Sequence, residues 1–152
     1  MKTVTSILEK LETLSEEQID QVLHVIDAMK NSKEGLHYNG RLQGINLEDN
    51  GEMTMTLGLQ NANSYGVAQG GALYTLADVA IGFTIMTKIP KDCQVFTLEL
   101  KMNYVKPGKG EKLYAKPIIN HLGRNTVVAE CKIVNEKDDL IALALGTFFL
   151  KR

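Results

Sequence analysis

The feature that most constrains this chain is an apolar segment near its middle, residues 72–86, whose only charged residue is Asp78. Its 15 positions fall short of the roughly 17–25 residues that a membrane-spanning helix needs, so the segment predicts a buried helix of a soluble domain. A helix that is apolar nearly all round must be covered on most of its sides. The rest of the chain therefore has to fold around it.

Alternating apolar and polar residues before and after this helix in the sequence predict the β-strands that would cover it. Before the helix, a hairpin is predicted over residues 45–59, with its turn at 49–51. The helix itself is expected to open at Gly70-Gly71 and to run to about Lys88, where Pro90 stops it. Four further strands are predicted, over 96–104, 111–121, 127–133 and 140–150. No helical crossover follows residue 92, so successive hairpins and an antiparallel sheet are expected, giving an α+β fold wrapped around one long helix.

The first thirty residues predict two amphipathic helices, separated by a capping box formed by Ser15 and Gln18. Three lysines against six acidic residues give this segment a charge of −3, which would repel nucleic-acid phosphates. We therefore expect these helices to pack on the rest of the molecule.

The composition of the whole chain excludes several classes of protein. With 152 residues and 44% hydrophobic residues, the chain can form one domain with a sizeable core. A net charge of −1 gives no case for binding nucleic acid or a membrane surface. The two cysteines have no CxxC spacing, the three histidines are scattered, and no signal-peptide pattern is present. We expect a cytoplasmic protein with no metal site and no disulfide.

Asp78 is the first catalytic candidate. Burying an unpaired carboxylate costs several kcal/mol, so its place in so apolar a helix needs a reason other than stability. The alternative is a structural carboxylate that caps a loop or pairs with a buried lysine.

Gly70 and Gly71, at the start of the same helix, expose unpaired backbone N–H groups that could polarise a carbonyl, although glycines at this place also serve plain packing. At about 1.5 Å per residue, Gly70 and Asp78 are ~12 Å apart along the axis, too far to act on one atom. If both act on the same carbon, they must come from different subunits. The catalytic hypothesis is therefore also a prediction of a dimer with its sites at the interface.

A second cluster is basic. Between Lys101 and Arg124, six basic residues stand against Glu111, a local charge of +5. Such a run is typical of a solvated sheet face with lysines that protect an edge. It would also suit the phosphates of a nucleotide-bearing ligand.

Several motifs resemble those of hotdog-fold acyl-CoA thioesterases of the phenylacetate-degradation (PaaI-like) family. The similar stretches are Asn63-x-x-Gly66-x-x-Gln69-Gly70-Gly71, Thr75-Leu76-Ala77-Asp78, Thr97 to Tyr104, Pro107-x-x-Gly110, Gly123-Arg124 and Ala142-x-Ala144-x-Gly146-Thr147-Phe148. The resemblance covers about residues 40–150. It implies a hotdog thioesterase domain over residues 33–152, with residues 1–32 as a helical extension packed on it.

The resemblance also implies site residues and partners. The position of Asp78 carries a general base or nucleophile, that of Gly70 polarises the thioester carbonyl from the other subunit, and those of Asn63 and Thr97 assist. The substrate is an acyl-CoA, hydrolysed without metal or separate cofactor by a homodimer or a tetramer of two dimers. The CoA contacts are expected at Gly71, Lys106, Lys109 and Arg124.

One residue departs from the family pattern: Gln69 stands where the family usually has histidine. Glutamine can donate a hydrogen bond or orient water, but it cannot deliver a proton near neutral pH. The departing thiolate needs little such help, because the unperturbed pKa of a thiol is about 8.5. Three alternatives remain: an acyl-CoA sensor or carrier without catalysis, a dehydratase or hydratase, and a purely structural dimer.

The sequence leaves the acyl group unidentified. Its length and aromaticity depend on how residues such as Tyr65, Leu73, Phe83 and Phe96 fill the pocket.

Overall fold

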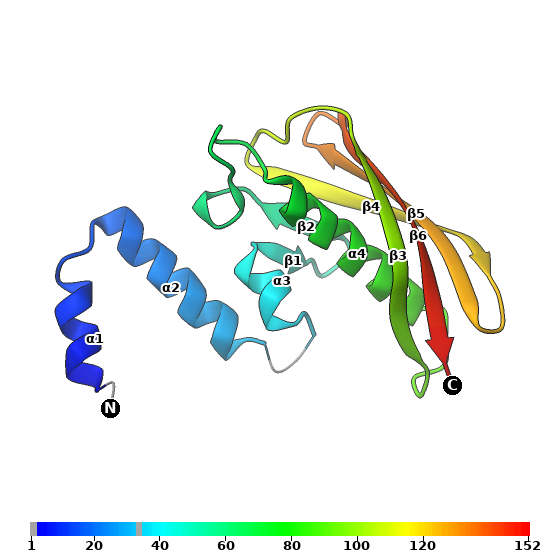
Figure 1. The fold of residues 1–152 in the computed structure, drawn as a ribbon, viewed down its shortest axis with the longest axis horizontal. Coiled ribbons are helices and arrows are strands. Elements are labelled where there is room, and N and C mark those ends of the chain that lie inside the picture. The colour runs from blue at the N-terminus through cyan, green and yellow to red at the C-terminus, as the bar shows by residue number, and fades with distance from the viewer. Residues whose placement is uncertain (1–2, 33–34) are drawn as a thin grey trace.

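The computed structural model describes residues 3–32 and 35–152, so the predicted boundary after residue 32 adjoins residues 33–34, which lie outside the described part. The elements are α1 (Val4–Leu11), α2 (Glu16–Lys30), α3 (Tyr38–Leu42), β1 (Ile45–Leu47), β2 (Met53–Thr56), the 3-10 helix η1 (Leu59–Asn61), α4 (Gly70–Met86), β3 (Gln94–Tyr104), β4 (Lys112–Leu122), β5 (Thr126–Asn135) and β6 (Leu140–Lys151). The sheet curls around α4, while α1 and α2 extend away from it (Figure 1). The predicted α+β architecture is confirmed.

The sheet has six strands within the described ranges, all paired antiparallel in the order β1-β2-β4-β5-β6-β3. The expectation of successive hairpins is wrong at one point, because β3 pairs with β6 and not with β4. The connecting segment crosses the end of the sheet, where the amides of Val105 and Lys106 donate to the carbonyl of Ile141. This crossover leaves β3 as an edge strand.

Helix α4 forms the centre of the core. Leu76, Ala77, Ala80, Ile81 and Ile85 have no exposed surface, and they pack against the inner face of the curled sheet. The two alanines let the backbone of the helix approach the strands closely. The helix ends at Met86, two residues before the predicted limit, and the segment that carries Pro90 follows.

The hairpin before α4 is shorter than predicted. Its return strand ends at Thr56, because Leu59 enters the 3-10 helix η1 instead of continuing the strand. The amide of Gly58 donates to Oδ1 of the buried Asn61, which holds this turn. A local side-chain hydrogen bond therefore overrides the alternating pattern.

The predicted capping box of α2 is present: Ser15 Oγ accepts from the amide of Gln18 at 3.3 Å, and Gln18 Oε1 accepts from the amide of Ser15 at 2.9 Å. Helix α1 has no buried residue, and α2 buries only Ala28. His24 Nε2 lies 2.9 Å from the carbonyl oxygen of Leu42, at the end of α3. The short helix α3, which the sequence pattern did not predict, thus contacts the N-terminal helix α2.

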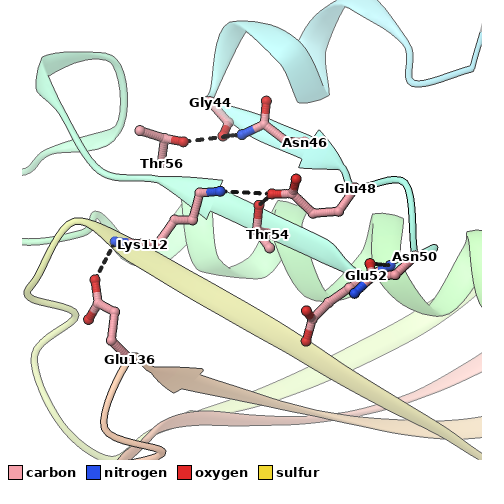
Figure 2. Close-up of polar contacts among 9 residues, drawn as sticks. All are labelled: Gly44, Asn46, Glu48, Asn50, Glu52, Thr54, Thr56, Lys112 and Glu136. Carbon is pink, nitrogen blue, oxygen red and sulfur yellow. Dashed lines mark hydrogen bonds and ion pairs between the residues drawn. The ribbon is translucent and has the colours of Figure 1, made fainter.

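A polar network fastens the β1–β2 hairpin to β4 (Figure 2). The carboxylate of Glu48 accepts hydrogen bonds from Thr54 Oγ1 at 2.7 Å and from Lys112 Nζ at 2.9 Å. The bond from Lys112, followed by that from Thr54, lowers the pKa of Glu48 below its usual value. Glu136 supports the same strand end, because its carboxylate accepts from the amide of Lys112 at 2.6 Å.

We predict that Glu48→Gln lowers the melting temperature at pH 7 and that this deficit shrinks in acid. The pKa of Glu48 is lower in the folded chain than its unfolded value near 4.5. Its contribution is therefore present above that value and is lost as the pH falls through the folded pKa. Thermal melts from pH 7 to pH 3 measure the difference, with Glu9→Gln on the exposed helix α1 as the control. A deficit that stays constant with pH would contradict this role.

Candidate active site

Helix α4 and strand β3 bring together the first catalytic candidate and its partner. Thr97 Oγ1 donates a hydrogen bond to Asp78 Oδ1 at 2.8 Å. Asp78 is half-buried in the single chain, which corrects the expectation of a fully buried carboxylate. Among the described residues, no lysine or arginine forms an ion pair with it. The alternative of a carboxylate paired with a buried lysine therefore has no support.

A cavity of about 180 Å³ lies beside this pair. Asp78 and Thr97 line it, together with His37, which immediately precedes α3. Most of the remaining lining is apolar and comes from α4, β3 and β6: Val79, Phe83, Met86, Val95 and Phe148. A carboxylate therefore faces a small, largely apolar space.

The start of α4 lines a different cavity, of about 360 Å³, together with Asn63, Leu73 and Lys106. Tyr104 Oη donates a hydrogen bond to the carbonyl oxygen of Gly70 at 2.8 Å. Burial, with a smaller effect of Tyr74, raises the pKa of the Tyr104 phenol above its usual value. The Gly70 and Asp78 cavities share no lining residue. One chain therefore does not unite Gly70 and Asp78 in a single site.

Three other predicted site residues shape the entry to α4. Gln69 is its N-cap, and Oε1 accepts from the amide of Ala72 at 2.9 Å. A Cβ at Gly71 would lie 2.8 Å from this oxygen, so the glycine leaves room for the cap. Asn63 Oδ1 accepts from the amides of Tyr65 at 2.9 Å and Val67 at 3.3 Å, which holds the loop before the helix.

The basic candidates lie at opposite ends of the sheet. Lys106 lines the Gly70 cavity and pairs with Asp139 at 2.7 Å, and this bond lowers the pKa of Asp139. Lys109 lines a neighbouring hollow. Arg124 lies in the turn after β4, whose 11 residues span roughly 35 Å. That turn adjoins the end of β6, where the amide of Leu150 donates to the carbonyl of Asn125. Lys106 and Lys109 therefore lie near Gly70, whereas Arg124 lies at the opposite end of the sheet.

Two of the polar lining residues, His37 and Tyr104, were not among the predicted site residues. Tyr104 appeared in the sequence as the last alternating residue of a strand and of the Thr97 to Tyr104 motif, whereas His37 belongs to no pattern. Of the four residues expected to fill the substrate pocket, Phe83 lines the Asp78 cavity and Leu73 the Gly70 cavity. Tyr65 and Phe96 are exposed in the single chain.

Neither a membrane helix nor a metal cluster is found in the part of the chain that the structure describes. No helix there combines the length and the apolar character needed to cross a membrane. No three His, Cys, Asp or Glu side chains there gather where they could hold a metal ion.

Comparison with known proteins identifies the family. The Thioesterase superfamily matches residues 65–142, just over half of the chain, and the chain belongs to this superfamily. The acyl-coenzyme A thioesterase PaaI of Escherichia coli (strain K12) is 28% identical over 99 residues, which cover 62% of this chain and 66% of that protein. The predicted family and the hotdog fold are confirmed.

Solved structures extend the similarity to the N-terminal helices. The BH2602 protein from Bacillus halodurans, crystallised with CoA, has a TM-score of 0.87 at 29% identity and is matched over 98% of this chain and 100% of that one. A hypothetical thioesterase from Streptococcus pneumoniae TIGR4, crystallised with coenzyme A, has a TM-score of 0.60 at 31% identity, over 66% of this chain and 79% of that one.

We predict that Tyr104→Phe lowers the free energy of unfolding by about 1 kcal/mol, because it removes the hydrogen bond to the Gly70 carbonyl. Chemical denaturation measures the change. Tyr114→Phe is the matched control, because no hydrogen bond involves the Tyr114 hydroxyl within the described ranges. Equal stability of the two variants would show that the contact does not hold the start of α4.

Proposed function

We propose that this protein is an acyl-CoA thioesterase that hydrolyses a thioester to a carboxylic acid and free CoA. The observation that carries the proposal is the Asp78 carboxylate, which is held by the Thr97 hydroxyl and faces a small, largely apolar cavity in a thioesterase-superfamily fold. The E. coli relative named as an acyl-CoA thioesterase, and the structural relatives crystallised with CoA, support the substrate class.

The active form in this proposal is a homodimer joined through β3. This strand is an unpaired edge of the sheet, and its Phe96, Leu98 and Tyr104 are exposed. A long apolar edge favours pairing with another strand. Two-fold pairing of β3 with its copy would set the two α4 helices antiparallel, because α4 packs on β3. The Gly70 end of one helix would then lie near Asp78 of the other. Association of two dimers into a tetramer stays a prediction of the family resemblance.

The chemistry follows from these groups. Asp78 activates a water molecule, or attacks directly, at the thioester carbonyl carbon. The Gly70 N–H of the partner donates a hydrogen bond to the developing oxyanion, a contribution of about 3 kcal/mol per donor. In the water route, a C–O bond forms, the C–S bond breaks, and the proton taken by Asp78 passes to the departing thiolate. Thr97 orients the carboxylate, and no separate cofactor takes part because CoA belongs to the substrate.

The same dimer would gather the basic residues around the CoA phosphates. Lys106 and Lys109 lie at the Gly70 end of one subunit, and Arg124 lies at the end of the sheet near Asp78. Antiparallel pairing would bring Lys106 and Lys109 of one subunit toward Arg124 of the other. We place the protein in the cytoplasm, in keeping with its free cysteines Cys93 and Cys131.

The second candidate is an acyl-CoA-binding protein without catalysis. It is favoured by Gln69, which caps α4 through Oε1 and has no proton to transfer near neutral pH. Saturable binding of acyl-CoA without release of thiol would distinguish this function from hydrolysis.

We predict that Asp78→Asn lowers the turnover number by a factor of roughly 10² to 10⁴, because the amide cannot accept the proton. Thiol release from short, medium, long-chain and aryl acyl-CoAs measures the rate. Asp92→Asn, in the exposed loop after α4, is the matched control. Full activity of Asp78→Asn would exclude the assigned role, and binding without thiol release by the wild type would favour the sensor or carrier.

A further inference from the structure

The turn between β5 and β6 bonds to one end of the β3–β4 connection, residues 105–111. Glu136, in this turn, accepts hydrogen bonds through Oε1 from the amides of Glu111 at 2.7 Å and Lys112 at 2.6 Å, the second of which is drawn in Figure 2. A Cβ at Gly110 would lie 2.5 Å from Glu136 Oε2, so the glycine leaves room for the carboxylate. The φ of +117° at this position also favours glycine. The carboxylate and the connection therefore fit each other closely.

The same turn bonds to the other end of the connection. Lys106 Nζ donates a hydrogen bond to Asp139 Oδ1 at 2.7 Å. Asn135 holds Asp139 in place, because its Nδ2 donates to Asp139 Oδ2 at 3.2 Å and its Oδ1 accepts from the Asp139 amide at 2.9 Å. Two carboxylates of one short turn thus hold the connection at both of its ends.

The middle of the connection contacts the segment that enters α4. The carbonyl of Gly108 accepts a hydrogen bond from the amide of Ala68 at 3.0 Å. Gly108 is buried, and a Cβ there would lie 2.8 Å from Ala68 Cβ. The next amide, that of Gln69, donates to the carbonyl of Asn61 at 2.8 Å. Hydrogen bonds therefore fix the two peptide groups that precede the one with the Gly70 N–H.

The Gly70 amide has no acceptor within the described ranges. Gly70 is the first residue of α4, where the helix supplies no carbonyl for the N–H. An oxyanion donor is effective when its direction is set before the reaction begins. The direction of this N–H follows from the backbone at Gln69, which the hydrogen bonds of Ala68 and Gln69 hold.

We propose, on the basis of the thioesterase function above, that Glu136 is a positioning residue for the Gly70 N–H. Glu136 does not touch the substrate. It fixes the β3–β4 connection, and the connection fixes the entry to α4 through the hydrogen bond between Gly108 and Ala68. The β5–β6 turn thereby sets the oxyanion donor of the site that Gly70 shares with the other subunit.

Hydrogen exchange tests this coupling without any reference to activity. Glu136→Ala removes both hydrogen bonds to the connection, so the exchange rate of the Ala68 amide, followed by NMR, should rise at least about ten-fold. Glu136→Gln, which keeps an acceptor oxygen, should restore most of the protection. The amide of Ile81, in the buried part of α4, reports general unfolding and should change far less. An unchanged rate at Ala68, or an equal rise at Ile81, would overturn the proposal.

The effect on catalysis is measured as thiol release from the acyl-CoA that the wild type hydrolyses fastest. The kcat of Glu136→Ala should fall about ten-fold while KM stays within about two-fold, because the oxyanion forms only in the transition state. Glu52→Ala removes a carboxylate that pairs with Lys116 and is the control, matched in charge. An unchanged kcat, a loss that lies mainly in KM, or an equal loss in the control would contradict the positioning role.

The two measurements separate failure of this inference from failure of the proposed function. If the wild type releases no thiol, the thioesterase proposal fails, and the exchange of the Ala68 amide still decides whether Glu136 holds the entry to α4. If the wild type is active and Glu136→Ala changes neither the exchange nor kcat, the positioning role fails and the thioesterase stands. Faster exchange at Ala68 with an unchanged kcat would also refute the positioning role.

Discussion

The structure depends on burying one helix that is apolar on nearly every side. The sheet curls around one side of α4 and takes five of its side chains out of solvent completely, while Gly71, Tyr74 and Met86 stay exposed in the single chain. This constraint also fixes the candidate chemistry. The first turn of α4 presents the Gly70 backbone, and Asp78 follows roughly 12 Å along the same axis. Both groups are held rigidly, and the rigidity prevents them from meeting within one chain.

The distance between Gly70 and Asp78 within one chain points to a role for the unpaired edge strand β3. Because β3 pairs with β6, its other side has no partner in the described chain, and it carries exposed apolar side chains next to Thr97. The cavities at Gly70 and at Asp78 have no residue in common, and the basic residues are divided between the same two ends. A second copy paired along β3 would bring Gly70 and Asp78 together, pair the free edge of the sheet, and join the two sets of basic residues.

Residue patterns predicted much of this architecture because they report burial directly. The alternation over residues 96–104 marks a strand, and the Ser15–Gln18 capping box marks the start of α2. Alternation does not say which strand lies alongside, so the pairing of β3 with β6 was missed. The Asp78–Thr97 contact was expected from the family resemblance, whereas His37 and Tyr104 reach their cavities only through tertiary packing. The capping role of Gln69 depends on backbone geometry at the start of α4, which the sequence does not specify.

The central claim is that each site combines Asp78 of one subunit with Gly70 of the other, and subunit mixing tests it most directly. Gly70→Pro removes the N–H at the first position of α4, where the helix backbone accepts proline, and the extended backbone of Gln69 suits a following proline. A Cβ at this position lies 3.2 Å from the Tyr104 ring, so that ring must shift by a few tenths of an ångström. Asp78→Asn and Gly70→Pro should each be inactive as homodimers. In a purified heterodimer one site carries both substitutions and the other carries neither, so about half of the wild-type activity should return. A heterodimer that stays inactive would contradict the shared site.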